Sequence, residues 1–484
     1  MPNQEHYDLI VRNATIVDGT RAPRYSGEIG VRGGRIAKLG ALGKAGASIE
    51  VDASGLIAAP GFIDAHTHDD RLLLSDPDVM PKLSQGVTTV VTGNCGISLA
   101  HSPAPHGAIT PPLDLLDSDG HWFRFPGFRA YREELEARPA AINAACLAGH
   151  TTFRVAAMDR LDRAATPAEI ARMREMARES LAAGAIGIST GTAYPPAACA
   201  TTEEIVEVCQ PLGEFGGLYA THMRNEDDRI TESMEETFGI GRALGVPVVI
   251  SHHKCVGTAN HGRSPATLAL IEKTLRTQPV GLDCYPYIAS STVLRYDRLE
   301  QSSRIIITWS KPHPEFSGVD LGEVARRLQM TKADAVEAIK PAGAIYFMLD
   351  EQDVRRILQY DHTMIGSDGL PHDARPHPRL WGTFPRVLGH YSRDLKLFPL
   401  ETAVYKMTGL TAKTFGLRGR GVLQEGAHAD ITIFDAATVI DAADFEHSTR
   451  PACGIATVIV NGEIAWRDGR PTGARAGCVL QRSA

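Results

Sequence analysis

The sequence predicts an α/β protein: a (β/α)8 TIM-like barrel with a small β-sandwich domain formed by both termini and an inserted lid subdomain. Through the middle of the chain, short β-branched or apolar runs alternate with helix-like segments, which indicates a parallel sheet. Eight such units can be counted, and eight is the number that closes a barrel. Strand-like alternation occurs near both ends, and one gap between units is too long for an ordinary loop.

Composition limits the class of protein. A chain of 484 residues indicates at least two domains, and 43% hydrophobic with 22% charged residues is typical of soluble globular proteins. The formal net charge of −7 argues against nucleic-acid or membrane partners. The eight cysteines are scattered, and residues 1–6 lack the features of a signal peptide. We therefore expect a cytoplasmic protein, as a monomer or small homo-oligomer, acting on a small molecule.

The two ends of the chain, residues 1–60 and 415–484, carry the alternation of half-buried strands. Strand-like runs occupy 7–10, 14–17, 27–31 and 35–39 at the first end, and 426–435 and 456–460 at the second. Asn461-Gly462 is a hairpin turn signal. Each end is too small to bury a core alone, so we expect the two to pair into one sandwich.

Residues 61–414 carry the barrel. The first strand precedes His66, and seven further strands are predicted at 88–91, 141–147, 185–189, 217–222, 246–252, 280–285 and 363–368. Helical patterns occupy 167–183, 202–215 and 230–244. The gap between the last two strands contains helical patterns at 321–328 and 332–339, and we interpret 288–349 as an insertion that covers the barrel mouth as a lid.

Residues 61–68, with the sequence GFIDAHTH, are the most informative stretch. Because side chains two apart leave the same face of a strand, His66 and His68 would point into one space, with Asp64 below them. An isolated histidine pair of this kind is most often a surface or packing feature. Here later strands supply further donors, which favours a metal site.

The active site of such a barrel lies at the carboxyl ends of its strands. The polar residues predicted there are His66 and His68 after the first strand, Cys95 after the second, His222 after the fifth, His252 after the sixth and Asp368 at the end of the eighth. Imidazole, thiolate and carboxylate at one mouth are the donors expected for zinc. The sequence therefore predicts a metal-dependent hydrolase.

These motifs resemble a known family. Residues 60–68, the later single histidines and the Ser367-Asp368-Gly369 run resemble the amidohydrolase superfamily. Residues 92–96 (TGNCG), 251–254 (SHHK) and 365–372 (IGSDGLPH) resemble the D-aminoacylases, the N-acyl-D-amino-acid deacylases, in a similarity that runs from about residue 7 to the C-terminus. The resemblance implies the fold already predicted and a zinc-dependent amide hydrolase.

One departure from the wider superfamily concerns the metal ligands. Many of its members bridge two metals with a modified lysine on the fourth strand, but residues 186–191 contain none. Cys95 is the expected substitute because a thiolate is a strong anionic zinc ligand. A buried structural cysteine is the alternative.

The resemblance also assigns ligand sets. Cys95, His222 and His252 would hold one zinc tightly and leave a position open for water. The resemblance selects His252 over His253. A second, weaker position would use His66, His68 and Asp368, with Cys95 shared. The sequence leaves the number of metals open.

The expected chemistry is attack of metal-activated water on the amide of an N-acyl-D-amino acid, which yields a carboxylate and a free D-amino acid. Asp368 would act as general base and then as general acid. The alternative for Asp368 is a helix N-cap. The preference for the D-enantiomer follows from the resemblance alone.

The α-carboxylate of the substrate needs a positive charge or hydrogen-bond donors from the protein. Arg379 is the leading candidate because a guanidinium can bind a carboxylate with two parallel bonds. Lys254 and Tyr285, with Tyr194 and Ser290 less strongly supported, would complete substrate binding. Arg295 could approach an acidic substrate side chain or face solvent.

Other functions remain open at this point. They are an N-acyl-D-glutamate-type deacylase, a cyclic amidase, a deaminase, a sugar deacetylase, and a scaffold protein that has lost its metal. The scaffold interpretation would require gaps in the ligand set, and the sequence has none.

Overall fold

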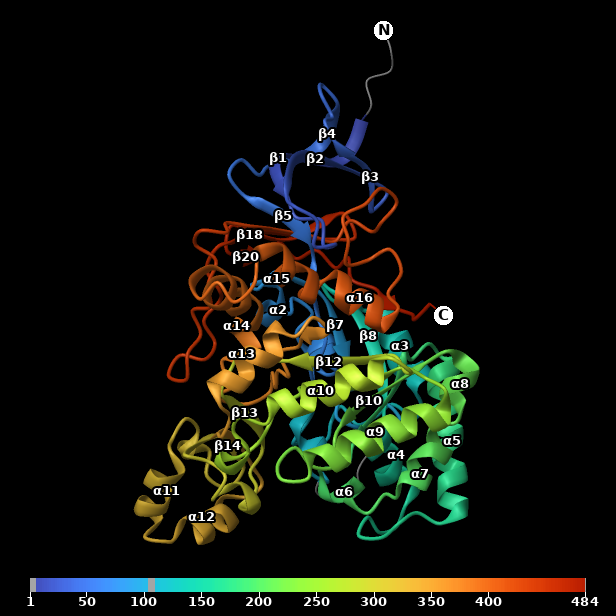
Figure 1. Ribbon diagram of the computed structural model, residues 1–484, viewed down its shortest axis with the longest axis vertical. Helices are drawn as coiled ribbons and strands as arrows, with labels where there is room; N and C mark the ends of the chain where they lie inside the picture. Colours follow the sequence, from blue (N-terminus) through green and yellow to red (C-terminus); the bar gives the residue numbers. More distant parts are fainter. Residues whose placement is uncertain (1–5, 103–108, 484) are drawn as a thin grey trace.

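The computed structural model describes residues 6–102 and 109–483. The first five residues, which entered the argument against a signal peptide, lie outside them. The molecule is elongated, with a sheet built from both chain ends at one extreme and the barrel with its insertion at the other (Figure 1). None of the described helices combines the length and the apolarity needed to cross a bilayer.

The predicted barrel is confirmed. Its eight strands are parallel neighbours in the order β6-β7-β8-β9-β10-β11-β12-β16. The backbone N–H of Ala65 donates to the carbonyl of Ile365 at 3.1 Å, which joins the first strand to the last. The bounds are β6 (Phe62–Asp64), β7 (Val87–Thr92), β8 (Asn143–Gly149), β9 (Gly187–Gly191), β10 (Leu218–His222), β11 (Val248–Ile250), β12 (Val280–Cys284) and β16 (Thr363–Ile365).

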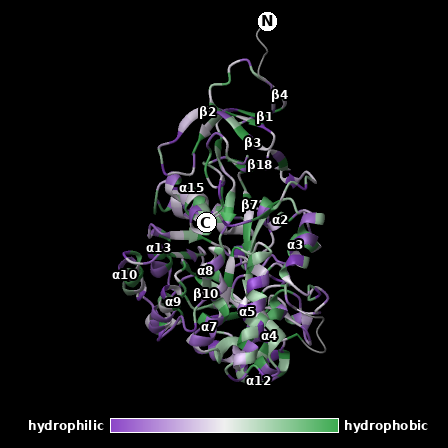
Figure 2. Cartoon of the chain, turned by 90° about the vertical axis from the view of Figure 1, so that its right-hand side faces the viewer, coloured by the Kyte–Doolittle hydropathy of each residue, from purple (hydrophilic) through white to green (hydrophobic). Residues whose placement is uncertain are grey.

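The barrel strands are buried along their whole length because helices cover their outer faces. Figure 2 shows hydrophobic residues concentrated around β7, while polar residues lie along outer helices such as α3 and α9. α5 begins with a capping box, in which the Thr166 and Glu169 side chains each bond the other's backbone N–H. The covering helices include α3 (Phe128–Ala137), α5 (Pro167–Ala182), α7 (Thr202–Cys209), α9 (Ile230–Leu244), α10 (Ser264–Leu275), α13 (Glu351–Gln359), α15 (Leu400–Met407) and α16 (Gly409–Phe415).

Strands from both chain ends share one sheet. β17 pairs with β5 in antiparallel register, with Thr432 opposite Ala59. The sheet curls, since Arg35 forms a bridge with His428 and the two ends bury a common aliphatic core. The runs 7–10 and 14–17 are one strand with a bulge. The strands are β1 (His6–Ile16), β2 (Tyr25–Arg32), β3 (Arg35–Gly40), β4 (Gly46–Asp52), β5 (Ile57–Pro60), β17 (Ile431–Phe434), β18 (Ile455–Val460), β19 (Glu463–Arg467) and β20 (Arg470–Pro471).

The last strand differs from expectation. β21 (Val479–Leu480) falls in the segment expected to complete the terminal sheet, but it pairs with β8 of the barrel. The chain end therefore ties the two parts of the molecule together.

The segment between β12 and β16 forms a small antiparallel sheet in the order β13-β15-β14, with its own apolar core. Its two helices match the predicted ranges, whereas its strands were not predicted. It projects at the lower left of Figure 1, away from the terminal sheet. The elements are β13 (Ala289–Val293), β14 (Arg304–Ser310), α11 (Leu321–Leu328), α12 (Lys332–Ile339) and β15 (Ala342–Phe347).

Candidate metal centre

The six predicted ligand side chains meet at the carboxyl ends of the barrel strands. Each lies at the end of its strand or within a few residues beyond it. All six side chains are buried. The residues are His66 and His68 after β6, Cys95 after β7, His222 at the end of β10, His252 after β11 and Asp368 after β16.

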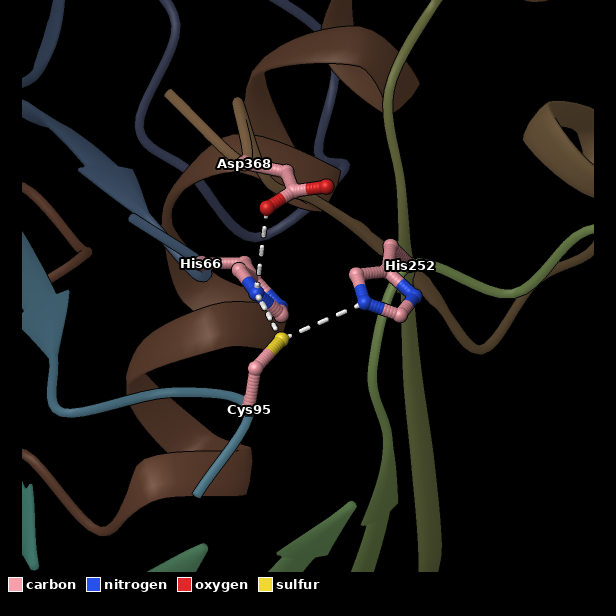
Figure 3. A group of neighbouring side chains, drawn as sticks. All are labelled: His66, Cys95, His252 and Asp368. Atoms are coloured by element: carbon pink, nitrogen blue, oxygen red, sulfur yellow. Dashed lines mark hydrogen bonds and ion pairs between the residues drawn. The ribbon is translucent and has the colours of Figure 1, made fainter. Parts of the chain in front are cut away.

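Cys95 lies between two imidazole rings. Its Sγ is 3.3 Å from Nε2 of His66 and 3.3 Å from Nε2 of His252. Oδ1 of Asp368 is 3.5 Å from Nε2 of His66 and 3.3 Å from Nε2 of His68. Donor atoms of His66, Cys95, His252 and Asp368 all lie within 4.8 Å of one another. Figure 3 shows the four side chains converging.

His252 links this group to a second one. Its Nε2 is 3.0 Å from Nδ1 of His222. His222, His252 and Glu226 form another set whose donor atoms lie within 4.8 Å of one another. Glu226 was not predicted from the sequence, although it follows His222 by four residues.

The backbone at three of these positions is left-handed. The φ angles are +54° at Cys95, +37° at His252 and +48° at Asp368. Such conformations are uncommon for residues other than glycine and cost about 1–3 kcal/mol each. This turn after the strand resolves the choice that alternation left open: His252 faces Cys95, while Nε2 of His253 is 2.9 Å from the Thr267 hydroxyl on α10.

The loop that carries Cys95 is packed tightly against β9. A Cβ at Gly191 would lie 2.1 Å from the carbonyl oxygen of Cys95, so only glycine fits there. The Ser189 hydroxyl accepts a hydrogen bond from the backbone N–H of Gly96 at 2.9 Å. β9, which contains no lysine, therefore holds the cysteine loop in place.

Burial controls the charge of the donors. It lowers the pKa of His66 to about 3 and that of His222 to about 4, so both rings are neutral at pH 7. Burial, with the nearby charge of Asp368, raises the pKa of the Cys95 thiol well above its usual value. Neutral imidazoles, a thiol that needs a cation in order to ionise, and a carboxylate make a donor set that fits a zinc-like divalent ion.

Asp368 is held as a carboxylate. Burial acts to raise its pKa, but the charge of Arg379, the charges of His252 and His66 when these rings are protonated, and a hydrogen bond from His68 outweigh burial and leave the pKa well below its usual value. Nη1 of Arg379 lies 2.9 Å from Oδ2 of Asp368. Asp368 thus faces the histidines with one oxygen and Arg379 with the other.

The predicted substrate-binding residues lie around this pair. Arg379 begins α14 (Arg379–Arg386), donates from Nη2 to the carbonyl of Ser291 on β13, and lies 4.7 Å above the Tyr285 ring. Nε of Arg379, the Tyr285 hydroxyl and the Ser290 hydroxyl are buried without a hydrogen-bond partner among the described residues. Because unpaired buried donors are costly, these three atoms indicate a place for a polar ligand group.

Tyr194 and Lys254 are already engaged. The Tyr194 hydroxyl is 3.0 Å from that of Thr292 on β13, and its ring packs edge-on against His222. Nζ of Lys254 is 2.8 Å from Oε1 of Glu226 and 2.8 Å from Nδ1 of His252. Lys254 therefore lies among the histidines, nearer the predicted metal ligands than the sequence suggested.

A buried ion network below the site was missed. Lys82 in α2 (Met80–Leu83) is fully buried, with Nζ 2.7 Å from Oδ2 of Asp64 and 3.4 Å from Oδ2 of Asp69. Oδ1 of Asp64 accepts hydrogen bonds from the backbone N–H groups of His66 at 3.2 Å and Ser367 at 2.8 Å. This network links the end of β6 to the loop that carries Asp368.

Asp283 on β12 is a second missed carboxylate. Its Oδ2 is 3.4 Å from Nδ1 of His66, and its Oδ1 accepts from the backbone N–H of His252 at 3.0 Å. Burial raises its pKa to about 7, against the opposing charge of His252. A charged residue inside an otherwise apolar strand was the only sequence signal for it.

Comparisons with known proteins identify the family of the chain. Residues 50–465 match the model of the amidohydrolase family, and the chain belongs to that family. Within it, the chain is 60% identical to D-aminoacylase of Alcaligenes xylosoxydans xylosoxydans over 100% of this chain and 99% of that protein.

Two solved structures extend the comparison. One is a D-aminoacylase described as having a binuclear metal centre with one-metal activation and second-metal attenuation. It superposes with a TM-score of 0.95 at 58% identity, covering 98% of this chain and 100% of that one. The other is N-acyl-D-glutamate deacylase from Bordetella bronchiseptica, complexed with zinc and a phosphonate mimic of the tetrahedral intermediate. Its TM-score is 0.95 at 47% identity, covering 99% and 100% of the two chains.

Replacing Lys82 with methionine should destabilise the fold strongly. The change leaves Asp64 and Asp69 buried without their cation, and breaking a buried pair costs about 3–5 kcal/mol of the free energy of unfolding. Urea unfolding of metal-free protein measures the loss. Lys340→Met is the matched control, since Lys340 pairs at 2.7 Å with an exposed glutamate, Glu337, and should change little. Equal losses in both variants would contradict the role given to Lys82.

Proposed function

We propose that this chain catalyses the zinc-dependent hydrolysis of N-acyl-D-amino acids to a carboxylate and a free D-amino acid. The observation that carries the proposal is the buried Cys95 thiol between the imidazoles of His66 and His252, beside the Asp368–Arg379 ion pair. The 60% identity to a D-aminoacylase over the whole chain supports the substrate class.

The distances from His252 to Cys95 and to His222, and from Asp368 to His66 and to His68, support the two ligand sets proposed from the sequence. Cys95, His222 and His252 would hold one zinc tightly, and His66, His68 and Asp368 would hold a second ion more weakly. When bound, zinc supplies a Lewis acid for the amide oxygen and lowers the pKa of a water that it binds to about 7.

Asp368 is the proposed general base and then general acid. Its lowered pKa keeps it ionised at neutral pH, which is the form in which a carboxylate can accept a proton. After the tetrahedral carbon forms, Asp368 would return that proton to the leaving nitrogen. The departing amine would then leave as a neutral group rather than as an amide anion.

Arg379, Tyr285 and Ser290 are proposed to bind the α-carboxylate of the substrate. The buried unpaired donors on all three support this assignment. Lys254 would add positive charge beside them, since its ammonium lies 5.9 Å from the Tyr285 ring. Tyr194 would border the reacting group, because its ring contacts His222.

The segment 288–349 is proposed to act as a lid. Its strand β13 contributes Ser290, the Ser291 carbonyl that accepts from Arg379, and the Thr292 hydroxyl beside Tyr194. A lid of this kind would exclude water from the bound substrate. We further propose a cytoplasmic monomer or small homo-oligomer, with neither nucleic acid nor membrane as partner.

The alternative is a substrate whose amino-acid side chain is acidic, and Arg295 is the residue that favours it. Arg295 donates to the carbonyl of Ala193, the residue before Tyr194, at 3.1 Å. Its guanidinium is also paired with Asp297 at 2.7 Å, which offsets its charge. A neutral side chain therefore remains the first choice.

Matched N-acetyl-D- and N-acetyl-L-methionine test the function directly. The purified protein should release acetate from the D-enantiomer, lose this activity after treatment with a strong chelator, and regain it on addition of zinc. N-acetyl-D-glutamate tests the acidic alternative in the same assay. Hydrolysis that continues at the same rate after treatment with the chelator, or that is faster with the L-enantiomer, would reject the proposal.

Asp368→Asn should lower turnover strongly while the protein keeps the zinc ion of its tight position. Loss of a general base and acid lowers kcat by about 10²–10⁴-fold. Zinc content, measured by atomic emission on the same samples, should stay at the wild-type value for the tight position. Near wild-type turnover would remove Asp368 from the mechanism.

Arg379→Lys should lower kcat/KM for substrates that carry an α-carboxylate. Loss of a bidentate charge-assisted contact costs about 1.5–3 kcal/mol, which corresponds to a roughly ten- to hundredfold lower kcat/KM. The control is an N-acyl amine without the carboxylate. Wild type and variant should hydrolyse it equally slowly, and an equal loss on both substrates would point to the Asp368 pairing instead.

A further inference from the structure

Glu226 lies behind two of the proposed ligands. It is buried in the turn after β10, and its two carboxylate oxygens face different rings. Oε2 is 3.4 Å from Nε2 of His222, and Oε1 is 3.2 Å from Nδ1 of His252. One carboxylate therefore contacts both histidines at the nitrogen that points away from Cys95.

The opposite nitrogens converge. Nδ1 of His222 and Nε2 of His252 lie 3.0 Å apart, and the latter is 3.3 Å from Sγ of Cys95. A neutral imidazole carries its proton on one nitrogen and a lone pair on the other. A carboxylate outside both rings favours the tautomers in which the two inner nitrogens keep their lone pairs.

The cluster of His222, Glu226 and His252 is not a separate metal site. Nζ of Lys254 already lies 2.8 Å from Oε1 of Glu226 and 2.8 Å from Nδ1 of His252, where a third ion would have to bind. An ammonium can donate but not accept, so at 2.8 Å it donates to a lone pair on Nδ1 of His252. A metal ion on Nε2 would require the proton on Nδ1, and Lys254 would then turn its donors to Glu226 and to the His252 carbonyl, which is 3.0 Å away. Lys254 thus balances the buried charge of Glu226.

We propose that Glu226 is a positioning residue that fixes the tautomer and the orientation of both His222 and His252, with Lys254 as its counter-ion. The inference rests on the ligand set of the proposed function. Carboxylates that accept from the outer nitrogen of a metal-bound histidine raise its basicity and hold its ring. Their loss costs about 10–100-fold in metal affinity.

Two substitutions separate this role from simple packing. Glu226→Gln retains the shape but offers one acceptor and one donor, so it can serve one histidine and forces the wrong tautomer on the other. Glu226→Leu serves neither. The expected order of zinc affinity is wild type, then Gln about 10–100-fold weaker, then Leu weaker still.

The experiment measures zinc affinity at fixed pH by competition with a chromogenic chelator. It adds the thiolate-to-cobalt absorption of cobalt(II)-loaded protein, which reports ligand geometry independently of turnover. Glu236→Gln is the matched control, because Glu236 pairs with Arg224 at 2.8 Å instead of with the ligand histidines. This control should keep wild-type affinity and spectrum.

The outcomes are distinguishable. Failure of the wild-type protein to bind zinc would overturn the proposed function itself. Wild-type binding with unchanged zinc affinity in both Glu226 variants would overturn only the present inference. A lower melting temperature of the metal-free variants with unchanged affinity and cobalt spectrum would likewise reject it, since that pattern describes packing. If the leucine variant does not fold, the glutamine variant alone decides.

Discussion

The arrangement of the site at the barrel mouth depends on one constraint. The Cys95 thiol is buried among imidazole rings, so it can ionise only when a cation binds beside it. Burial raises the pKa of Cys95 and lowers the pKa of His66, so without a cation the pair is neutral. A divalent ion can balance the thiolate and Asp368 together, which explains why these groups are tolerated in the interior. The left-handed backbone at Cys95, His252 and Asp368 turns each side chain toward this point, at a strain that the surrounding packing must offset.

Much of this arrangement could be predicted because a parallel barrel brings the carboxyl ends of all its strands to one edge. His222 ends an apolar run, and His252 and Asp368 follow closely after one, so the run marks the strand and its end marks the site. Alternation could not choose between His252 and His253, because parallel strands are buried on both faces. The positive φ at His252 makes that choice in the structure.

Two of the residues that sequence reasoning missed, Lys82 and Asp283, have partners that are distant in the chain. Lys82 pairs with Asp64 and bonds the Ser367 hydroxyl, and Asp283 approaches His66 from β12, on the far side of β16. Nothing local in the sequence distinguishes Lys82 from a surface charge, and the apolar strand around Asp283 was the only signal for that residue. The strands of the insertion were missed for a similar reason, since β13 and β15 pair only after about fifty intervening residues are folded. The helices of that segment, which are local, were found.

The coordination of the tight metal position is the central claim, and X-ray absorption at the zinc edge of protein loaded with one equivalent of zinc tests it most directly. The account predicts one sulfur neighbour at about 2.3 Å together with imidazole nitrogens at about 2.0–2.1 Å. It also predicts that the sulfur contribution disappears in Cys95→Ser. A zinc environment of nitrogen and oxygen alone in the wild-type protein would contradict it.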